Sequence, residues 1–263
     1  MDKKKLNIYL IRGLTRESGH WGNFVNLLES QMPEAKIHLM DLPGAGIYHK
    51  TNAPSSFKKM VDFMRKDMID RINPEEHNII FATSLAGMLA TEWTINYKND
   101  FDGLIMVNSS FKGICSTNER ANKSIRGDML RILLTNSIKK RERLIIKVNS
   151  NKPGMVDKLL DTWILIQKKR KMSRINILRQ ILAGMRYELK GGKPEIPILV
   201  IGSKGDRMVS PSCIEKIHNH FGGDLIWHPT SGHGLPLDEP EWLSKTVSNW
   251  SRESFKNYKE KIA

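Results

Sequence analysis

Hydrophobic positions along the chain fall into two kinds of pattern. Short, mostly apolar segments predict strands over residues 6–11, 35–40, 79–81, 102–107, 196–201 and 225–227. Apolar residues at helical spacing predict helices over residues 20–30 and 55–72, after Pro211, and through a last helix carrying Trp242, Leu243, Val247 and Trp250. Strands that alternate with helices predict an α/β fold whose mainly parallel sheet is covered by helices on both faces.

One stretch combines both patterns within a few residues. An apolar run at 79–81 leads into the small residues of ATSLAG at 82–87, and a helix-compatible run follows at once. This order predicts a strand, a very sharp turn and a helix, with Ser84 at the apex and the first helical amides pointing at the same place. Ser84 there is either an exposed nucleophile or an ordinary helix cap, and this stretch alone does not separate the two.

Two further loops follow predicted strands and carry complementary chemistry. Asp206 lies in the loop after the strand ending at residue 201, and His233, flanked by glycines, follows the strand ending near residue 227. The carboxyl ends of parallel strands share one edge of a sheet, so we expect Ser84, Asp206 and His233 to meet there. A serine needs a base within reach, and that base needs a partner that fixes its tautomer. Separately, Asp206 is also explained as a turn cap and His233 as a structural histidine.

The chain resembles the α/β-hydrolase superfamily over nearly its full length. The matching pieces are Gly13-Leu14 after the first strand, DLPG at 41–44, ATSLAG at 82–87, GSKGDRMV at 202–209 and GHGLPLDEP at 232–240. The resemblance implies a nucleophile at Ser84, an acid at Asp206, a base at His233, and an oxyanion hole from the backbone amides of Leu14 and Leu85. The first strands of the full family sheet are absent, so we expect about six core strands, and the implied reaction requires no metal or organic cofactor.

The sequence departs from the superfamily pattern at two places. Arg12-Gly13 stands where the family usually has His-Gly, and Ala82 and Ala86 replace the outer glycines of the nucleophile motif. Arg12 is a candidate substrate-pocket residue, which either holds an acidic side chain or binds a substrate carboxylate.

The net charge of +14 is concentrated in the middle of the chain. Residues 112–190 hold 20 Lys and Arg against 6 Asp and Glu, whereas the rest of the chain is balanced. We therefore expect a hydrolase core over 1–111 and 191–263 and a basic helical cap over 112–190, where the superfamily inserts a cap. Apolar stripes at 159–164 and 175–185 predict helices there, and the expected pocket residues on the inner face of the cap are Met155, Leu160 and Trp163. Such a pocket favours an acyl or alkyl ester over a sugar or a nucleotide.

The basic cap has three interpretations. It is a solvated surface, a docking site for an acidic carrier protein, or a contact for nucleic acid or anionic lipid. The layout is similar to the pimeloyl-carrier-protein methyl ester esterases, which use basic cap residues to bind their carrier. Nucleic acid ranks last, because no recognition motif is present and the cap is poor in aromatic residues for base stacking.

The remaining features concern location. Cys115 and Cys213 show no framework or metal spacing and are interpreted as free thiols in a reducing compartment. The N-terminal apolar run is short and broken by Arg12, and no stretch is long enough to span a bilayer. A cytoplasmic protein is therefore expected, with a polar tail that frays beyond Ser251.

Together these features predict a serine hydrolase. The expected reaction is cleavage of a small-molecule carboxylic ester or thioester through an acyl-enzyme. Two alternatives remain open: an esterase that acts on an acyl group held by an acidic carrier protein, and a non-catalytic α/β-hydrolase scaffold that binds a small ligand.

Overall fold

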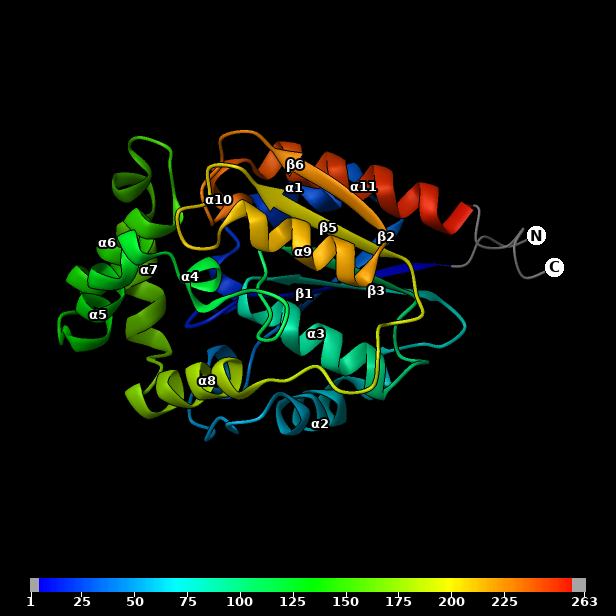
Figure 1. Cartoon of the computed structure of the whole chain (residues 1–263), viewed down its shortest axis with the longest axis horizontal. Helices are drawn as coiled ribbons and strands as arrows, with labels where there is room; N and C mark the ends of the chain where they lie inside the picture. The colour runs from blue at the N-terminus through cyan, green and yellow to red at the C-terminus, as the bar shows by residue number, and fades with distance from the viewer. Residues whose placement is uncertain (1–4, 257–263) are drawn as a thin grey trace.

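A single parallel sheet forms the centre of the molecule. The computed structural model describes residues 5–256, and its six strands lie in the order β2-β1-β3-β4-β5-β6 (Figure 1). Every neighbouring pair of strands is parallel. The strands are β1 Leu6–Ile11, β2 Ala35–Met40, β3 His77–Thr83, β4 Gly103–Val107, β5 Ile198–Ser203 and β6 Asp224–His228. The predicted α/β-hydrolase fold with about six core strands is confirmed.

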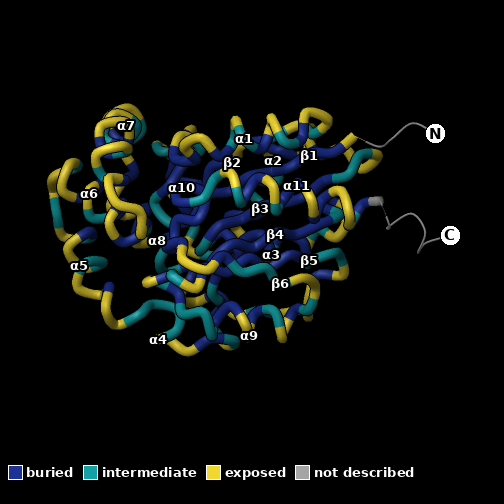
Figure 2. Tube along the Cα trace, turned by 90° about the horizontal axis from the view of Figure 1, so that it is seen from above, coloured by how far each residue is buried: buried dark blue, intermediate teal, exposed yellow. Residues whose placement is uncertain are grey.

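Helices cover both faces of this sheet. One face packs against α1 (Phe24–Gln31) and α11 (Pro240–Lys256), and the other against α2 (Phe57–Met68), α3 (Leu85–Asn96) and α9 (Pro211–Phe221). A short helix, α10 (Leu235–Asp238), follows β6. The strands in the centre are buried along almost their whole length (Figure 2).

Strand β1 shows why the apolar runs were continuous. Ile8 and Leu10 point into the core under α1 and α11, whereas Tyr9 and Ile11 point into the core under α2 and α3. A strand that is buried on both faces has no polar side to alternate with. Strand β1 occupies the predicted residues 6–11, and β2, the edge strand with Lys36 and Leu39 exposed, occupies the predicted residues 35–40.

Two predicted boundaries were wrong. The first helix begins at Phe24 instead of residue 20, because residues 18–20 form a separate 3-10 turn and Gly22 has φ +62°. Helix α11 does not fray after Ser251 but continues to Lys256. Phe255 holds this last turn by packing against Trp250 and over Gly103 in the core. Residues 257–263 of the predicted tail lie outside the described residues.

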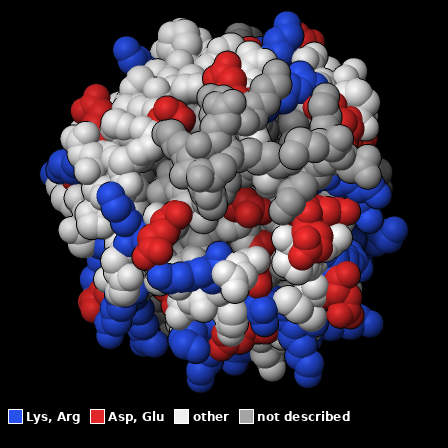
Figure 3. Space-filling model, turned by 90° about the vertical axis from the view of Figure 1, so that its right-hand side faces the viewer, with Lys and Arg blue, Asp and Glu red and all other residues white. Residues whose placement is uncertain are grey.

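The basic segment between β4 and β5 is helical. It contains α4 Thr117–Arg120, α5 Arg126–Leu134, α6 Ile138–Asn149, α7 Met155–Lys169 and α8 Arg174–Arg186. Helices α5 to α7 lie together at one end of the molecule, far from both termini (Figure 1). At the opposite end, shown in Figure 3, basic and acidic side chains are interspersed.

Helix α8 turns a different face to the protein from the predicted one. Ile175, Leu178 and Met185 of the expected apolar stripe are exposed. The buried side carries Asn176 and Gln180, whose side-chain amides donate to backbone carbonyls in residues 43–51. The hydrogen bonds from Asn176 and Gln180 to a loop of the core therefore favour burial of this face, although the spacing of apolar residues predicted another.

The prediction of two free thiols was wrong. Cys115, after β4, forms a disulfide with Cys213 at the start of α9, across 98 residues of sequence. The fold brings two residues together that are distant in the sequence, so their spacing gave no indication of a disulfide. A reducing, cytoplasmic location therefore loses the support that free thiols gave it. None of the helices within residues 5–256 has the length and apolar character needed to cross a membrane.

Reduction of this disulfide is expected to destabilise the protein. A cross-link that closes a loop of about 100 residues restricts the unfolded chain and typically contributes about 2–4 kcal/mol. Urea unfolding with and without reductant measures the difference. A Cys115→Ser/Cys213→Ser variant should show the lower stability without reductant and no response to it. An unchanged midpoint after complete reduction, verified by thiol titration, would contradict the expectation.

Candidate active site

Ser84 occupies a strained corner between β3 and α3. Its backbone has φ 55° and ψ −125°, and its amide donates to the carbonyl of Val107 at 2.8 Å. Two glycines make room for this corner: a Cβ at Gly13 would lie 2.9 Å from Ser84 Cβ, and one at Gly87 would lie 2.1 Å from Ser109 Oγ. A positive φ at serine is costly and persists only where the surrounding structure imposes it.

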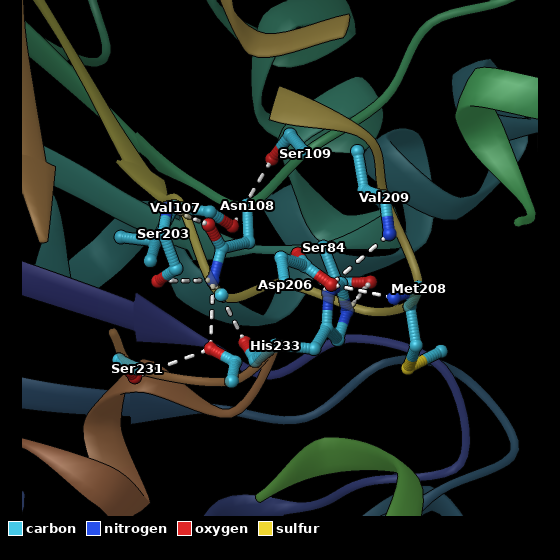
Figure 4. Close-up of polar contacts among 12 residues, drawn as sticks. Ser84, Val107, Asn108, Ser109, Ser203, Asp206, Met208, Val209, Ser231 and His233 are labelled. Atoms are coloured by element: carbon cyan, nitrogen blue, oxygen red, sulfur yellow. Dashed lines mark hydrogen bonds and ion pairs between the residues drawn. The ribbon is translucent and has the colours of Figure 1, made fainter. Parts of the chain in front are cut away.

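The three predicted residues come from three separate loops, and His233 lies within hydrogen-bonding distance of the other two (Figure 4). His233 Nε2 is 2.8 Å from Ser84 Oγ, and His233 Nδ1 is 2.7 Å from Asp206 Oδ2. The histidine and the aspartate are both buried, whereas Ser84 is half-buried and borders a cavity. The arrangement therefore joins an accessible hydroxyl, an imidazole and a shielded carboxylate in one line.

The Asp206 carboxylate is fixed in orientation by backbone amides. Its Oδ1 atom accepts hydrogen bonds from Met208 N at 2.7 Å and Val209 N at 3.0 Å, which leaves Oδ2 for the imidazole (Figure 4). An ionised carboxylate only accepts hydrogen bonds, so the proton lies on His233 Nδ1. Nε2 then has a free lone pair facing the Ser84 hydroxyl.

Asn108 ties three of the strand ends together. Its side chain donates to Ser203 Oγ at 3.1 Å and to the carbonyl of His233 at 2.9 Å, and it accepts from Ser203 N at 2.8 Å. Asn108 itself has φ 48°, a conformation that asparagine tolerates better than most residues. Sequence reasoning missed this residue. The only available signal was a polar side chain directly after the β4 strand.

Asp238 and Asn151 connect the histidine loop to the helical segment. Asp238 Oδ2 accepts from Gly232 N at 2.8 Å and from Asn151 N at 3.0 Å. The Asn151 side chain donates to the carbonyls of Gly205 at 2.8 Å and Thr230 at 3.1 Å. The link between α6 and α7 is thereby bonded to both loops that carry Asp206 and His233.

The amides of Leu14 and Leu85 border the same corner. A Cβ at Gly13 would lie 3.5 Å from Leu85 N, so the loop after β1 packs directly against the start of α3. Within residues 5–256, neither amide has a hydrogen-bond acceptor. Both donors are therefore free for an external oxygen atom beside Ser84.

A cavity that opens to solvent borders Ser84 and His233. Its lining joins the strand ends to helices of the basic segment. The apolar part consists of Leu14, Met129, Ile132, Leu133, Ile145, Val148, Ile177, Ile181, Met208 and Pro236. An apolar wall beside a few polar groups suits a small organic ligand.

Of the four predicted pocket residues, only Arg12 lines this cavity. Met155, Leu160 and Trp163 instead belong to a hydrophobic cluster that packs α6 against α7. Trp163 lies behind the cavity, where the Arg16 guanidinium stacks 4.7 Å from its ring centroid. The helical periodicity identified buried positions correctly but could not distinguish a helix–helix contact from a cavity wall. Within residues 5–256, no group of His, Cys, Asp and Glu side chains is arranged to hold a metal ion.

Comparison with known proteins finds a family and several solved structures that resemble this chain. The sequence profile described as serine aminopeptidase, S33, matches residues 2–240. A putative non-heme bromoperoxidase from Mycobacterium tuberculosis H37Rv superposes with a TM-score of 0.73 at 15% identity, covering 96% of this chain and 94% of that one. An esterase from Rhodococcus sp. ECU1013 also gives 0.73, at 14% identity, covering 95% and 91%. At such identities the structures establish the shared fold alone.

A curated relative is similar over part of the chain. The pimeloyl-[acyl-carrier protein] methyl ester esterase of Wigglesworthia glossinidia brevipalpis is 33% identical over 107 residues. This alignment spans 40% of the present chain and 37% of the relative.

Proposed function

The chain belongs to the serine aminopeptidase S33 family of α/β-hydrolases, and we propose that it is a serine hydrolase that cleaves a carboxylic ester or thioester. The observation that carries the proposal is the continuous hydrogen-bonded line from Ser84 Oγ through His233 to Asp206 Oδ2. An accessible hydroxyl bonded to a base, with that base oriented by a buried carboxylate, is the arrangement that activates serine toward a carbonyl carbon.

The proposed reaction has two halves. Ser84 Oγ attacks the carbonyl carbon while His233 Nε2 takes its proton, and the carbonyl oxygen becomes an oxyanion held by the amides of Leu14 and Leu85. Collapse of this intermediate expels the alcohol or thiol, which receives the proton from His233. Water then attacks the acyl-enzyme with the same base, releasing the acid and restoring Ser84. Asp206 keeps the imidazole in the required tautomer and stabilises its protonated form.

Residues 112–190 act as a cap in this proposal. The apolar side chains of α5, α6 and α8 close the cavity over Ser84, and the bonds of Asn151 hold this cap on the loops of the core. Exclusion of water strengthens the electrostatic interactions that stabilise the transition state.

A carrier-linked acyl ester is the second candidate substrate. Two observations favour it: the excess of Lys and Arg in residues 112–190, and the similarity of part of the chain to a pimeloyl-[acyl-carrier protein] methyl ester esterase. A positive face accelerates association with an acidic carrier, whereas an uncharged small ester feels no such steering.

Reversal of two exposed charges tests the carrier candidate. Lys139 and Lys140 are exposed on α6, whereas Arg141, next in the sequence, is buried against Glu142 and is unsuitable. A Lys139→Glu/Lys140→Glu variant is expected to lose at least about five-fold more kcat/KM on a carrier-linked methyl ester than on the free methyl ester. The matched control is Lys59→Glu/Lys66→Glu on α2, which is exposed but distant in sequence. Equal losses on both substrates, or equal effects of both variants, would exclude the candidate.

The hydrolase proposal itself is tested by assaying the protein against p-nitrophenyl acyl esters. Turnover that depends on Ser84 supports it. Failure of the folded protein to hydrolyse any such ester would favour the non-catalytic scaffold.

A further inference from the structure

Arg12 is a buried charge without an acidic partner. It follows β1 directly, is only 4% exposed, and lines the cavity beside Ser84. Its guanidinium stacks on Trp21 at 4.8 Å from the ring centroid, and its Nε has no hydrogen-bond partner in the part of the chain that the structure describes. Among residues 5–256 no carboxylate forms an ion pair with it. Burial of an unpaired charge is expensive, so its retention points to a ligand that neutralises it.

The rest of the cavity reinforces this positive charge. Arg12, Arg16 and Arg141 all line the cavity, and the described lining contains no Asp or Glu. One carboxylate, Glu142, serves two of them, at 2.7 Å from Arg16 Nη1 and 3.3 Å from Arg141 Nε. Arg12 is therefore the one of these three arginines that has no carboxylate partner among the described residues.

The electrostatic environment of Arg12 disfavours its charged form. Burial and the neighbouring Arg16 lower the pKa of Arg12 to about 9. Burial also lowers the pKa of His20, which lies close to both arginines, so His20 adds no charge of its own near pH 7. A bound anion would reverse the destabilisation of the Arg12 guanidinium, because an opposite charge favours the ionised form.

We propose that Arg12 binds a carboxylate of the substrate, so that the cavity selects esters which carry a free carboxylate beside a short apolar chain. The planar fork of a guanidinium matches the two oxygens of a carboxylate. The aliphatic lining of the same cavity fits the methylene groups between that carboxylate and the scissile ester. This specificity rests on the proposed hydrolase function, whereas the anion binding itself does not.

Matched pairs of esters test the selection. The first pair is monomethyl adipate and its neutral terminal amide, with the charge on the acyl side. The second pair is 4-acetoxybutyrate and its amide, with the charge on the alcohol side. The wild type is expected to favour the charged member of one pair by roughly 10-fold or more in kcat/KM, mainly through KM, because the charge is remote from the reacting carbonyl. The favoured pair identifies the side of the ester that reaches Arg12.

Substitution of Arg12 assigns the preference to this side chain. Arg12→Gln keeps hydrogen-bond donors but loses the charge, and it should reduce the ratio of charged to neutral kcat/KM by about 10-fold. The control Arg186→Gln removes an exposed arginine at the end of α8 and should leave this ratio unchanged. Arg12→Met should unfold at no lower temperature than the wild type, since it removes an unpaired buried charge; a large drop in the midpoint would instead indicate a structural arginine.

Calorimetry separates this inference from the hydrolase proposal. Ser84→Ala protein should bind monomethyl adipate or 4-acetoxybutyrate, whichever is favoured, and lose that binding when Arg12→Gln is added. Binding without any hydrolysis by the wild type would retain the carboxylate site and overturn the proposed function. Hydrolysis of neutral esters, with no preference for either charged ester in the wild type, would overturn the carboxylate site and retain the proposed function.

Discussion

Replacement of Ser84 with alanine is expected to lower kcat on p-nitrophenyl acyl esters by at least about 10³-fold. The reason is specific to the site, because alanine removes the only atom that His233 Nε2 contacts at 2.8 Å and with it the acyl-enzyme. Residual activity would come from the backbone amides of Leu14 and Leu85, which would still stabilise the oxyanion when water attacks the bound ester.

The fold is expected to survive this change. Within residues 5–256 the Ser84 side chain forms no hydrogen bond other than that to His233, and the glycines around the corner remain. Circular dichroism and a thermal melt verify the fold, and Ser124→Ala, on an exposed serine, is the matched control. Turnover within ten-fold of the wild type would rule out Ser84 as the nucleophile.

Asp206→Asn is expected to lower kcat by about 10⁴-fold, which is the size of effect known for the equivalent change in a serine protease triad. The orientation of the amide follows from its neighbours. Met208 N and Val209 N donate to Oδ1, so the amide oxygen occupies that position and the NH₂ group faces His233. The imidazole then places its proton on Nε2, where it can no longer accept the proton of Ser84.

Steady-state kinetics at pH 7–8 measure the effect of this aspartate. The fold should again be retained, because the amide satisfies both backbone donors. Asp161→Asn, on an exposed position of α7, controls for the loss of a carboxylate. A decrease of less than ten-fold would mean that the Asp206–His233 contact does not govern the tautomer during turnover.

The architecture was largely predictable from the sequence, and the reason lies in burial. Strands β1, β3 and β4 are covered on both faces, so their residues form continuous apolar runs. Parallel strands also place every loop after a strand at one edge. That geometry is why Ser84, Asp206 and His233 could be grouped before their positions were known.

Other features left no local signal. The buried Arg16–Glu142 ion pair spans 126 residues and the Cys115–Cys213 disulfide spans 98, so neither shows a recognisable spacing. Asn108 acts through bonds to backbone atoms and a serine hydroxyl, which no residue pattern specifies. Contacts of this kind depend on the finished tertiary structure.

The pocket was the least predictable part. Apolar periodicity correctly placed Leu160 and Trp163 inside the protein but assigned them to the wrong surface. Arg12 stood out in the sequence because it occupies the position where the superfamily usually has a histidine. Its significance became clear only from the absence of an acidic partner among the described residues.

The most direct test of the whole account is covalent labelling of the wild-type protein with a fluorophosphonate, followed by peptide mass spectrometry. We expect one adduct on the peptide that contains Ser84, its loss in Ser84→Ala, and much slower labelling in Asp206→Asn. Folded wild-type protein that takes up no label, or a label that persists in Ser84→Ala, would contradict the assignment of Ser84 as an activated nucleophile.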